Sequence, residues 1–308
     1  MPETYDVAII GGGPAGLTAG LYAARAMLKA VLIDKTGGGG WLNNTLQIEN
    51  YPGFPDGISG PDLAARFIDH AAKFGLQILL EEVVHVVARA DPKVVQTTSA
   101  EHSARTVIIC TGSRPRMLGV PGEKEFAGRG VSYCATCDAA LFSGANVAVV
   151  GGGNSAIDEA LAIARIAQQV HVIHRRNVLR AEKVLQERAF ANGKISFVWD
   201  TIVERINGAK TVSSLSLRNV KTGDTSEMPV SGLFIFVGTQ PSSEFLKGEV
   251  KIDERGYIVI NEQLETTARG VWAAGDVADP IYRQAVTAAG RGAAAAILVE
   301  RYLQSAKI

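Results

Sequence analysis

The feature that most restricts the fold is a glycine-rich pattern that occurs twice, 140 residues apart. Residues 5–34 read as an apolar strand, a glycine-rich turn, a helix and a second apolar strand, and residues 147–176 repeat this order. The small residues of the two turns are Gly11, Gly13 and Gly16, and then Gly151, Gly153 and Ala156. A βαβ unit with this turn binds a dinucleotide at its helix N-terminus. Two copies in register predict an α/β chain with two Rossmann-like nucleotide-binding domains.

The two copies differ where their second strands end. The first ends at Asp34, where a carboxylate accepts a hydrogen bond from a ribose hydroxyl, whereas the second ends at His174-Arg175-Arg176, followed by Arg180. A guanidinium fork binds a 2′-phosphate that an acid would repel. We therefore expect the first site to take FAD and the second to prefer NADPH over NADH. The alternative for the basic cluster is a solvated helix start, with Arg180 one helical turn beyond the strand.

Two further apolar strands end in glycine, at Gly112 and Gly238. We interpret each as the exit strand, the last strand before the chain leaves a nucleotide domain. The chain has 308 residues, which also favours two domains over one. Cys110 lies inside the first exit strand and is interpreted as a small buried side chain.

A Cys-x-x-Cys pair, Cys134 and Cys137, is followed at once by Asp138. A zinc site needs four ligands, and this pair supplies two, so we expect no metal. A structural disulfide is disfavoured in a reducing compartment. A redox dithiol is favoured, because a thiolate at a helix start attacks a disulfide and its neighbour resolves the mixed disulfide. Asp138 is then a candidate proton donor or acceptor, or simply an aspartate in a first helical turn.

Charge and cysteine content narrow the possible partners and compartment. Lys and Arg together number 31, as do Asp and Glu, so a nucleic-acid or anionic membrane partner is not expected. No apolar stretch approaches the roughly 18 residues of a membrane span, and the N-terminus does not read as an export signal. Three cysteines are too few for a disulfide-built secreted scaffold, so a cytoplasmic location is expected.

The order of motifs along the chain resembles the low-molecular-weight thioredoxin reductases. The two glycine-rich turns, at 11–16 and 151–156, are called the first and second fingerprints. They are combined here with "IENYPGF" (48–54), "CATCD" (134–138) and "GVWAAGD" (270–276). The resemblance covers essentially the whole chain. It implies a homodimeric flavoprotein with an FAD domain at residues 1–115 and 244–308 and an inserted NADPH domain at 116–243 that carries the Cys-x-x-Cys.

The resemblance also implies an activity and its residues. NADPH reduces FAD, FAD reduces the Cys134–Cys137 disulfide, and the dithiol reduces thioredoxin or a similar protein. Cys137 would contact the flavin and Cys134 would attack the partner, with Asp138 assisting. The FAD residues would be Gly11, Gly13, Pro14, Ala15, Gly16, Asp34, Lys35, Gly40, Trp41, Asn50, Gly112, Gly275, Asp276, Arg283, Gln284 and Ala285. The NADPH residues would be Gly151, Gly153, Asn154, Ser155, Ala156, His174, Arg175, Arg176, Arg180 and Gly238.

Three positions depart from the family pattern, one of them Asn177, which replaces the commoner aspartate after the paired arginines. Trp41 stands where relatives have a glutamine that approaches the flavin, so an indole there would alter stacking or solvent access. Asn154 replaces a commoner aspartate in the second fingerprint, and we expect it still to cap a helix.

Two other functions are compatible with the fold. A ferredoxin or flavodoxin reductase passes electrons from NADPH through FAD without cysteines, and the Cys-x-x-Cys-Asp motif argues against it. A flavin-containing redox sensor, whose dithiol gates a partner interface, is a non-enzymatic alternative, because a fold does not determine a function.

Overall fold

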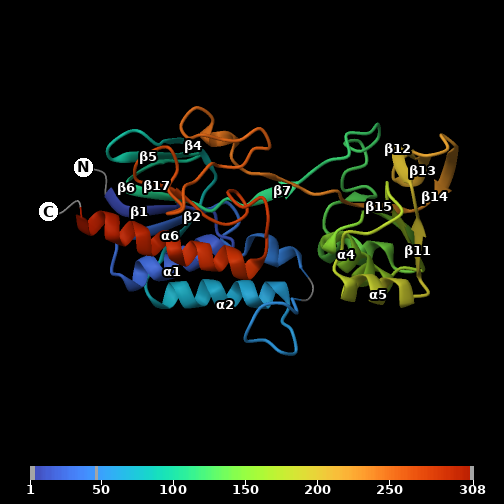
Figure 1. Ribbon diagram of the computed structural model, residues 1–308, viewed down its shortest axis with the longest axis horizontal. Coiled ribbons are helices and arrows are strands. Elements are labelled where there is room, and N and C mark those ends of the chain that lie inside the picture. The colour runs from blue at the N-terminus through green and yellow to red at the C-terminus, as the bar shows by residue number, and fades with distance from the viewer. Residues whose placement is uncertain (1–3, 46–47, 306–308) are drawn as a thin grey trace. The chain divides into compact units, whose positions relative to one another are not determined.

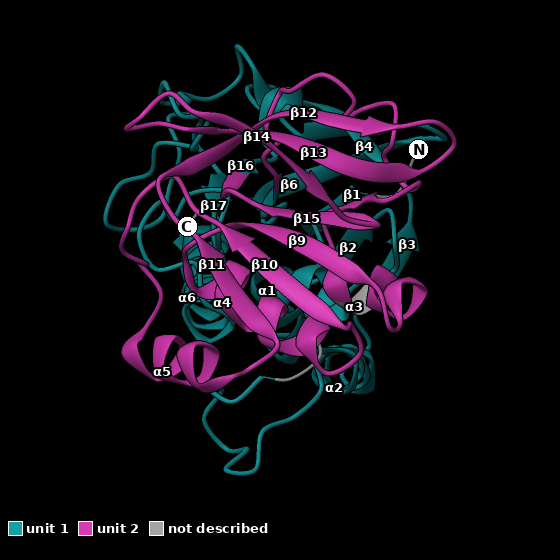
Figure 2. Cartoon of the chain, turned by 90° about the vertical axis from the view of Figure 1, so that its right-hand side faces the viewer, with its two compact units in different colours: residues 1–114, 240–308 teal, residues 115–239 magenta. Residues whose placement is uncertain are grey.

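The structure, a computed structural model, describes residues 4–45 and 48–305, except for the side chains of Thr136 and Cys137. The chain divides into two compact units. Unit 1 comprises Met1–Arg114 and Gln240–Ile308, and unit 2 comprises Pro115–Thr239 (Figure 2). Each unit is built around its own mainly parallel sheet, so the predicted α/β architecture with two Rossmann-like domains is confirmed.

Unit 1 contains a seven-stranded sheet in the order β3-β2-β1-β6-β5-β4, with β17 also paired to β6. Strands β3, β2, β1, β6 and β17 are parallel, and β5 and β4 continue the sheet in antiparallel fashion. The strands are β1 (Thr4–Ile10), β2 (Ala30–Asp34), β3 (Gln77–Leu80), β4 (Val83–Val87), β5 (Lys93–Thr97), β6 (Glu101–Ile109) and β17 (Val271–Ala273). The helices are α1 (Pro14–Arg25), η1 (Gly40–Asn44), α2 (Gly60–Lys73), η3 (Glu244–Leu246) and α6 (Ala285–Ser305) (Figure 1).

Both faces of this sheet are buried, which explains why its central strands are continuously apolar. Val7 and Ile9 of β1 pack in a cluster with residues of α1 and α6, and Ala8 and Ile10 pack in a second cluster with residues of β4 and β5. Successive strand residues point to opposite faces of a sheet, so burial of both faces requires all four of these residues to be apolar. Small residues let α6 lie close to α1, since a Cβ added at Gly292 would lie 2.0 Å from the Ala15 carbonyl oxygen.

Unit 2 repeats the same sheet order. Its parallel sheet runs β11-β10-β9-β15-β8. The first four of these strands correspond in order to β3-β2-β1-β6 of unit 1, so β15 is the exit strand as β6 is in unit 1. A three-stranded antiparallel sheet, β12-β13-β14, completes the unit. The parallel strands are β8 (Val131–Ser132), β9 (Asn146–Gly151), β10 (Gln169–Ile173), β11 (Ile195–Val198) and β15 (Gly232–Phe236). The other elements are α3 (Ala135–Asp138), η2 (Ala139–Phe142), α4 (Asn154–Ala164), α5 (Lys183–Ala191), β12 (Thr201–Gly208), β13 (Val212–Asn219) and β14 (Thr225–Pro229).

The chain passes between the units twice, and the two connecting segments pair with each other. They are β7 (Ser113–Pro115) and β16 (Thr239–Pro241), which form a two-stranded sheet. The expected glycines lie beyond the exit strands, because β6 ends at Ile109 and β15 at Phe236. They support the pairing of β7 with β16, since the backbone N–H of Ser242 donates to the Gly112 carbonyl at 3.0 Å and that of Arg116 donates to the Gly238 carbonyl at 2.9 Å. Both glycines have positive φ, +63° and +110°, where a side chain is disfavoured.

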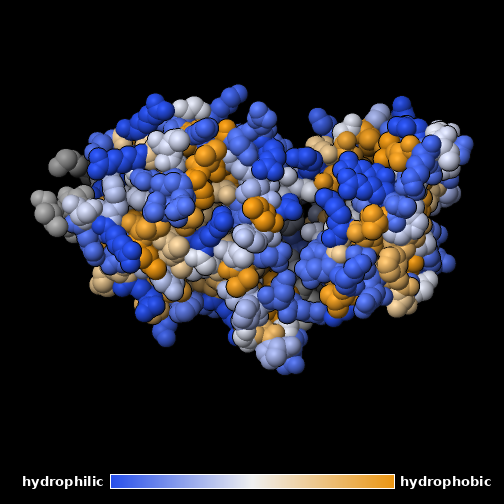
Figure 3. All heavy atoms as spheres, viewed as in Figure 1, coloured by the Kyte–Doolittle hydropathy of each residue, from blue (hydrophilic) through white to orange (hydrophobic). Residues whose placement is uncertain are grey.

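No helix in the described part of the chain is long and apolar enough to cross a membrane. Figure 3 shows apolar residues broken up by hydrophilic ones on the face in view.

Candidate active site

The first fingerprint turns as its glycines require. Gly11 has φ +101°, and a Cβ added there would lie 2.5 Å from the Cys110 carbonyl oxygen, while one added at Gly16 would lie 1.8 Å from the Gly11 carbonyl oxygen. A Cβ at Gly13 would meet nothing within 4 Å. Helix α1 begins at Pro14 with no side-chain cap, so its first N–H groups lack intrahelical partners. This open helix start fits a pyrophosphate.

Asp34 lies against the first fingerprint. Its Oδ2 atom accepts from the Gly12 backbone N–H at 2.7 Å, and its Oδ1 atom accepts from Thr36 and from the Gly38 backbone N–H. Burial raises the pKa of Asp34, but these hydrogen bonds, the Thr36 hydroxyl first, together lower it by more, so the net pKa is below its ordinary value. The group is therefore an anion at neutral pH. Oδ2, with one hydrogen bond, retains acceptor capacity for a ribose hydroxyl.

The residues after β2 lie in two different environments. The Lys35 side chain is 65% exposed and forms a 3.3 Å ion pair with Glu82, so it is directed at that surface carboxylate. Gly40 and Trp41 begin η1, where the Trp41 indole N–H donates to the Ser113 carbonyl at 2.8 Å. The departure from the family pattern at position 41 thus ties η1 to β7.

The C-terminal motif packs directly on the first fingerprint. Gly275 has φ +77°, and a Cβ there would lie 2.9 Å from the Ala15 Cβ. The pKa of the adjacent Asp276 is raised to about 6, by burial first and then by the negative charge of Asp279, while the positive charge of Arg283 opposes both. A carboxylate next to an open helix start is placed to accept hydrogen bonds from cofactor hydroxyls.

The raised pKa of Asp276 predicts a stability effect. Between the ordinary value of 3.8 and about 6, folded flavin-free protein holds a proton that the unfolded chain lacks, so the unfolding free energy decreases as pH rises through this window. Asp276→Asn removes this penalty. We expect flavin-free Asp276→Asn to be more stable than wild type by about 1–3 kcal/mol at pH 7.5, with the difference vanishing near pH 4. Urea unfolding at both pH values measures this, and a difference independent of pH would contradict it.

Asn50 and Gln284 are brought together although 234 positions separate them. The Asn50 side-chain amide donates to Gln284 Oε1 at 3.0 Å. The neighbouring Arg283 is exposed and has φ +50°, an unusual conformation for a residue with a side chain. Ala285, the first residue of α6, packs with the apolar cluster around Leu42. The two sequence stretches assigned to the flavin therefore lie side by side in unit 1.

The second fingerprint repeats the geometry of the first. A Cβ added at Gly151 would lie 2.5 Å from both the Phe236 carbonyl oxygen and the Ala156 Cβ, whereas one at Gly153 would meet nothing within 4 Å. Helix α4 also begins without a side-chain cap, with Ser155 exposed in its first turn. This helix start fits a second pyrophosphate.

Asn154 differs from its expected role as a cap. Its Oδ1 atom accepts from the Glu182 backbone N–H at 2.8 Å, and its Nδ2 atom donates to Glu182 Oε1 at 2.8 Å. Because Glu182 immediately precedes α5, Asn154 joins the starts of α4 and α5 and does not cap its own helix.

His174 is separated from the basic cluster. It is 6% exposed, and a Cβ added at Gly152 would lie 2.5 Å from its ring. Burial lowers the pKa of His174, and the charges of Arg180, Arg175 and Arg176 lower it further, so the ring is neutral at pH 7. Its Nε2 atom has no hydrogen-bond partner among the described residues. Asp34 occupies the same position against Gly12, so a neutral ring replaces the carboxylate.

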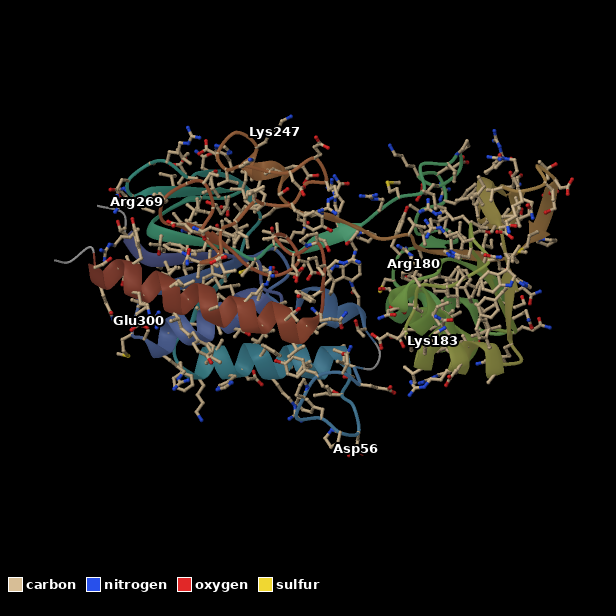
Figure 4. The ribbon with its side chains drawn as sticks, viewed as in Figure 1. Asp56, Arg180, Lys183, Lys247, Arg269 and Glu300 are labelled. Carbon is tan, nitrogen blue, oxygen red and sulfur yellow. The ribbon has the colours of Figure 1, made fainter. Side chains whose placement is uncertain are left out.

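Three arginines supply the positive charge next to the second fingerprint. Arg175, Arg176 and Arg180 are all exposed. Residues 174–182 are not helical, so these solvent-exposed arginines do not lie at a helix start, and Arg180 is held by its backbone N–H, which donates to the Gly152 carbonyl at 2.6 Å. Figure 4 labels Arg180 in the part of unit 2 that contains α4 and α5.

The cysteine motif lies at the end of β8. Cys134 is disulfide-bonded and precedes the four-residue helix α3, while Cys110 is a buried free thiol whose pKa is raised by burial. The side chain of Cys137 lies outside the described residues. Among the side chains that are described, no group of three His, Cys, Asp or Glu could hold a metal ion.

Three residues around this motif were not identified by the sequence patterns. The Ser132 hydroxyl donates to Asp138 Oδ2 at 2.6 Å, and the Tyr133 hydroxyl donates to Glu123 Oε1 at 2.7 Å. Glu123 is 1% exposed and also accepts from the backbone N–H groups of residues 118 and 119. Serine side chains commonly accept a hydrogen bond from the backbone N–H two residues on, as Ser132 does from Cys134, so a serine after an apolar strand was the available signal.

Comparison with known proteins places the chain among disulfide oxidoreductases. Residues 5–292 match the pyridine nucleotide-disulphide oxidoreductase family. The thioredoxin reductase of Streptomyces coelicolor is 47% identical over 306 residues, covering 98% of this chain and 95% of the relative. The bifunctional thioredoxin reductase/thioredoxin of Mycobacterium leprae is 45% identical over 301 residues, covering 97% of this chain and 66% of the relative.

A solved structure supports the same assignment. The thioredoxin reductase of Lactococcus lactis matches with a TM-score of 0.96 at 41% identity, covering 98% of this chain and 99% of the other. The resemblance inferred from the order of motifs is thereby confirmed. The chain belongs to the pyridine nucleotide-disulphide oxidoreductase family.

Proposed function

We propose that the chain is an NADPH-dependent thioredoxin-disulfide reductase that uses FAD. The observation that carries this proposal is the turn after β8, where disulfide-bonded Cys134 and an anchored Asp138 lie in the same unit as a fingerprint flanked by exposed arginines. An electron carrier alone needs no such turn. Close relatives named thioredoxin reductase support the same activity.

The residues of unit 1 fit FAD. The open start of α1 suits its pyrophosphate, ionised Asp34 suits its ribose, and Asp276 lies next to the same helix start. Asn50 and Gln284, joined to each other, are proposed to lie along the ring. The chemistry that FAD supplies when bound is the conversion of a hydride from NADPH into an electron pair for a disulfide.

The residues of unit 2 fit NADPH better than NADH. Three exposed guanidinium groups lie close enough to His174, whose ring packs against Gly152, to act on its charge, and a 2′-phosphate there would be bound bidentately. Position 174, equivalent to the acid of the first site, carries no charge and so does not repel that phosphate.

The dithiol acts by exchange. Once the Cys134 disulfide is reduced, one thiolate attacks a disulfide of the partner and forms a mixed disulfide, which the second thiolate resolves, so the pair is reoxidised and the partner gains two electrons. By analogy with the family we assign the attack to Cys134 and the resolving thiol to Cys137. Asp138 is proposed to exchange protons with the pair.

The proposed protein partner is a thioredoxin. The Mycobacterium leprae relative is named as a bifunctional thioredoxin reductase/thioredoxin, which supports this partner. We further propose a homodimer, which sedimentation equilibrium tests, since a purely monomeric protein would exclude it. The cytoplasm is the proposed location, because a dithiol that donates electrons operates where thiols are kept reduced.

The decisive experiment measures both halves of the reaction. Bound flavin should be reduced by NADPH much faster than by NADH, and the protein should then turn over repeatedly on a thioredoxin disulfide. Fast flavin reduction without disulfide turnover, but with ferredoxin or flavodoxin reduction, would favour the electron-carrier alternative. A single reduction of the dithiol without multiple turnover would favour the redox sensor.

A further inference from the structure

The turn that carries Cys134 encloses one buried hydroxyl. Ser132, the last residue of β8, is 4% exposed, and its Oγ atom has three neighbours. It accepts from the Cys134 backbone N–H at 3.1 Å, and it lies 3.1 Å from the Cys134 carbonyl oxygen and 2.6 Å from Asp138 Oδ2. The hydroxyl therefore links the backbone of the first cysteine to the carboxyl group that follows the second.

A hydroxyl has only one proton, so its two acceptors compete for it. The shorter contact is to a carboxylate, and hydrogen bonds to charged acceptors are about twice as strong as neutral ones. While Asp138 is ionised, the Ser132 hydroxyl therefore donates its hydrogen bond to Asp138 Oδ2 and not to the Cys134 carbonyl. The Cys134 carbonyl still accepts from the Asp138 backbone N–H at 3.2 Å, so no group is left unsatisfied.

Protonation of Asp138 reverses this arrangement. The carboxylic acid then has a proton to donate, and the second lone pair of Ser132 Oγ can accept it. The Ser132 proton turns to the Cys134 carbonyl at 3.1 Å. One buried hydroxyl thus satisfies both protonation states without any movement of the backbone.

Other ionisable groups near this turn are accounted for. Helix α4, which packs against α3, carries Asp158 and Glu159, and burial followed by the charge of Asp158 raises the pKa of Glu159 to about 8. Tyr133 donates to Glu123, and strands β9 and β15 and helix η2 carry no ionisable side chain. Glu159 is thus the neighbouring group whose effect on a pH profile must be separated from the role of Asp138.

We propose that Ser132 is a positioning residue for thiol–disulfide exchange, which fixes the Asp138 carboxyl against the Cys134 backbone so that the carboxylate can take the proton of an attacking thiol. This inference rests on the proposed function. When the attacking cysteine of the reduced pair is activated, its thiol proton moves to Asp138 and its sulfur becomes a thiolate. The Ser132 hydroxyl then turns to donate to the Cys134 carbonyl.

The test compares Ser132→Ala with wild type in a reaction that does not use the flavin. The dithiol is reduced chemically, the reductant is removed, and the rate of exchange with 5,5′-dithiobis(2-nitrobenzoate) is measured against pH without NADPH. Loss of the hydroxyl removes the hydrogen bond that holds the carboxylate in place, so we expect exchange on the acid limb of the profile to be about tenfold slower. Flavin reduction by NADPH should stay at the wild-type rate.

Three comparisons make the result specific. Ser132→Thr, which keeps the donor, should restore the profile, and Ser132→Val, its hydroxyl-free match, should not, so this pair repeats the test if alanine loosens the turn. Ser243→Ala removes another buried hydroxyl, one bonded to the Gly256 carbonyl in unit 1, and should leave the profile unchanged. In an Asp138→Asn background, Ser132→Ala should have no further effect on the limb, whereas in Glu159→Gln it should have its full effect.

A profile that is identical in Ser132→Ala and wild type would overturn the inference, as would an equal shift in Ser243→Ala. Failure of the proposed function is visible separately. In that case wild type would exchange with the small disulfide and yet leave a thioredoxin disulfide unreduced.

Discussion

Cys134→Ser lowers the turnover of a thioredoxin disulfide by at least roughly 10³-fold, while NADPH continues to reduce the bound flavin. A serine hydroxyl neither forms a disulfide nor attacks one at neutral pH. The variant therefore keeps its nucleotide sites but lacks the dithiol that passes electrons to the thioredoxin disulfide. Stopped-flow measurement of flavin reduction and a steady-state thioredoxin assay separate the two effects.

Cys110→Ser is the matched control for this substitution. Cys110 is a free, 4% exposed thiol in the core of unit 1, so its replacement should leave disulfide turnover intact apart from a modest loss of stability. Full turnover in Cys134→Ser would reject the dithiol mechanism, and persistence of ferredoxin or flavodoxin reduction in that variant would identify the electron-carrier alternative.

Replacing Arg175, Arg176 and Arg180 together with alanine removes the preference for NADPH. Each guanidinium–phosphate hydrogen-bonded pair contributes about 1.5–3 kcal/mol, and a bidentate contact consists of two such pairs, so the ratio of kcat/KM for NADPH over NADH should fall by about 10²–10⁴. The rate with NADH should change little, because NADH has no 2′-phosphate. Flavin reduction at several concentrations of each nucleotide measures this ratio.

Lys183→Ala is the control for simple loss of charge. Lys183 is an exposed cation at the start of α5, labelled near Arg180 in Figure 4, and no backbone contact joins it to Gly152 as one joins Arg180. We expect it to change the ratio less than about threefold. If the triple arginine variant kept its preference, or lost NADPH and NADH rates equally, the assignment of the 2′-phosphate to this cluster would be wrong.

The sequence predicted those parts of the fold that depend on local pattern. Gly11 and Gly151 each begin a turn that only glycine can make, and the apolar strands around them carry their burial in their composition. Because both copies follow the same local rules, the sequence alone was enough to predict two nucleotide-binding domains of the same kind.

Contacts that depend on residues distant along the chain could not be predicted in this way. Asn154 binds Glu182 because a loop returns there, and His174 is buried because Gly152 leaves room for its ring. A basic pattern in sequence does not reveal which of its members is shielded from water. Ser132 had a local signal, but the identity of its second partner, Asp138, depends on the turn between them.

The pairing of β7 with β16 has an architectural consequence. Unit 2 begins and ends at one place, since backbone hydrogen bonds hold its entry and its exit side by side. Unit 2 is therefore an insertion between two paired strands of the chain. If it were deleted, a tight turn would be enough to join residue 114 to residue 240. Such an arrangement permits a whole module to be acquired, exchanged or removed in a single genetic event without rethreading the host fold.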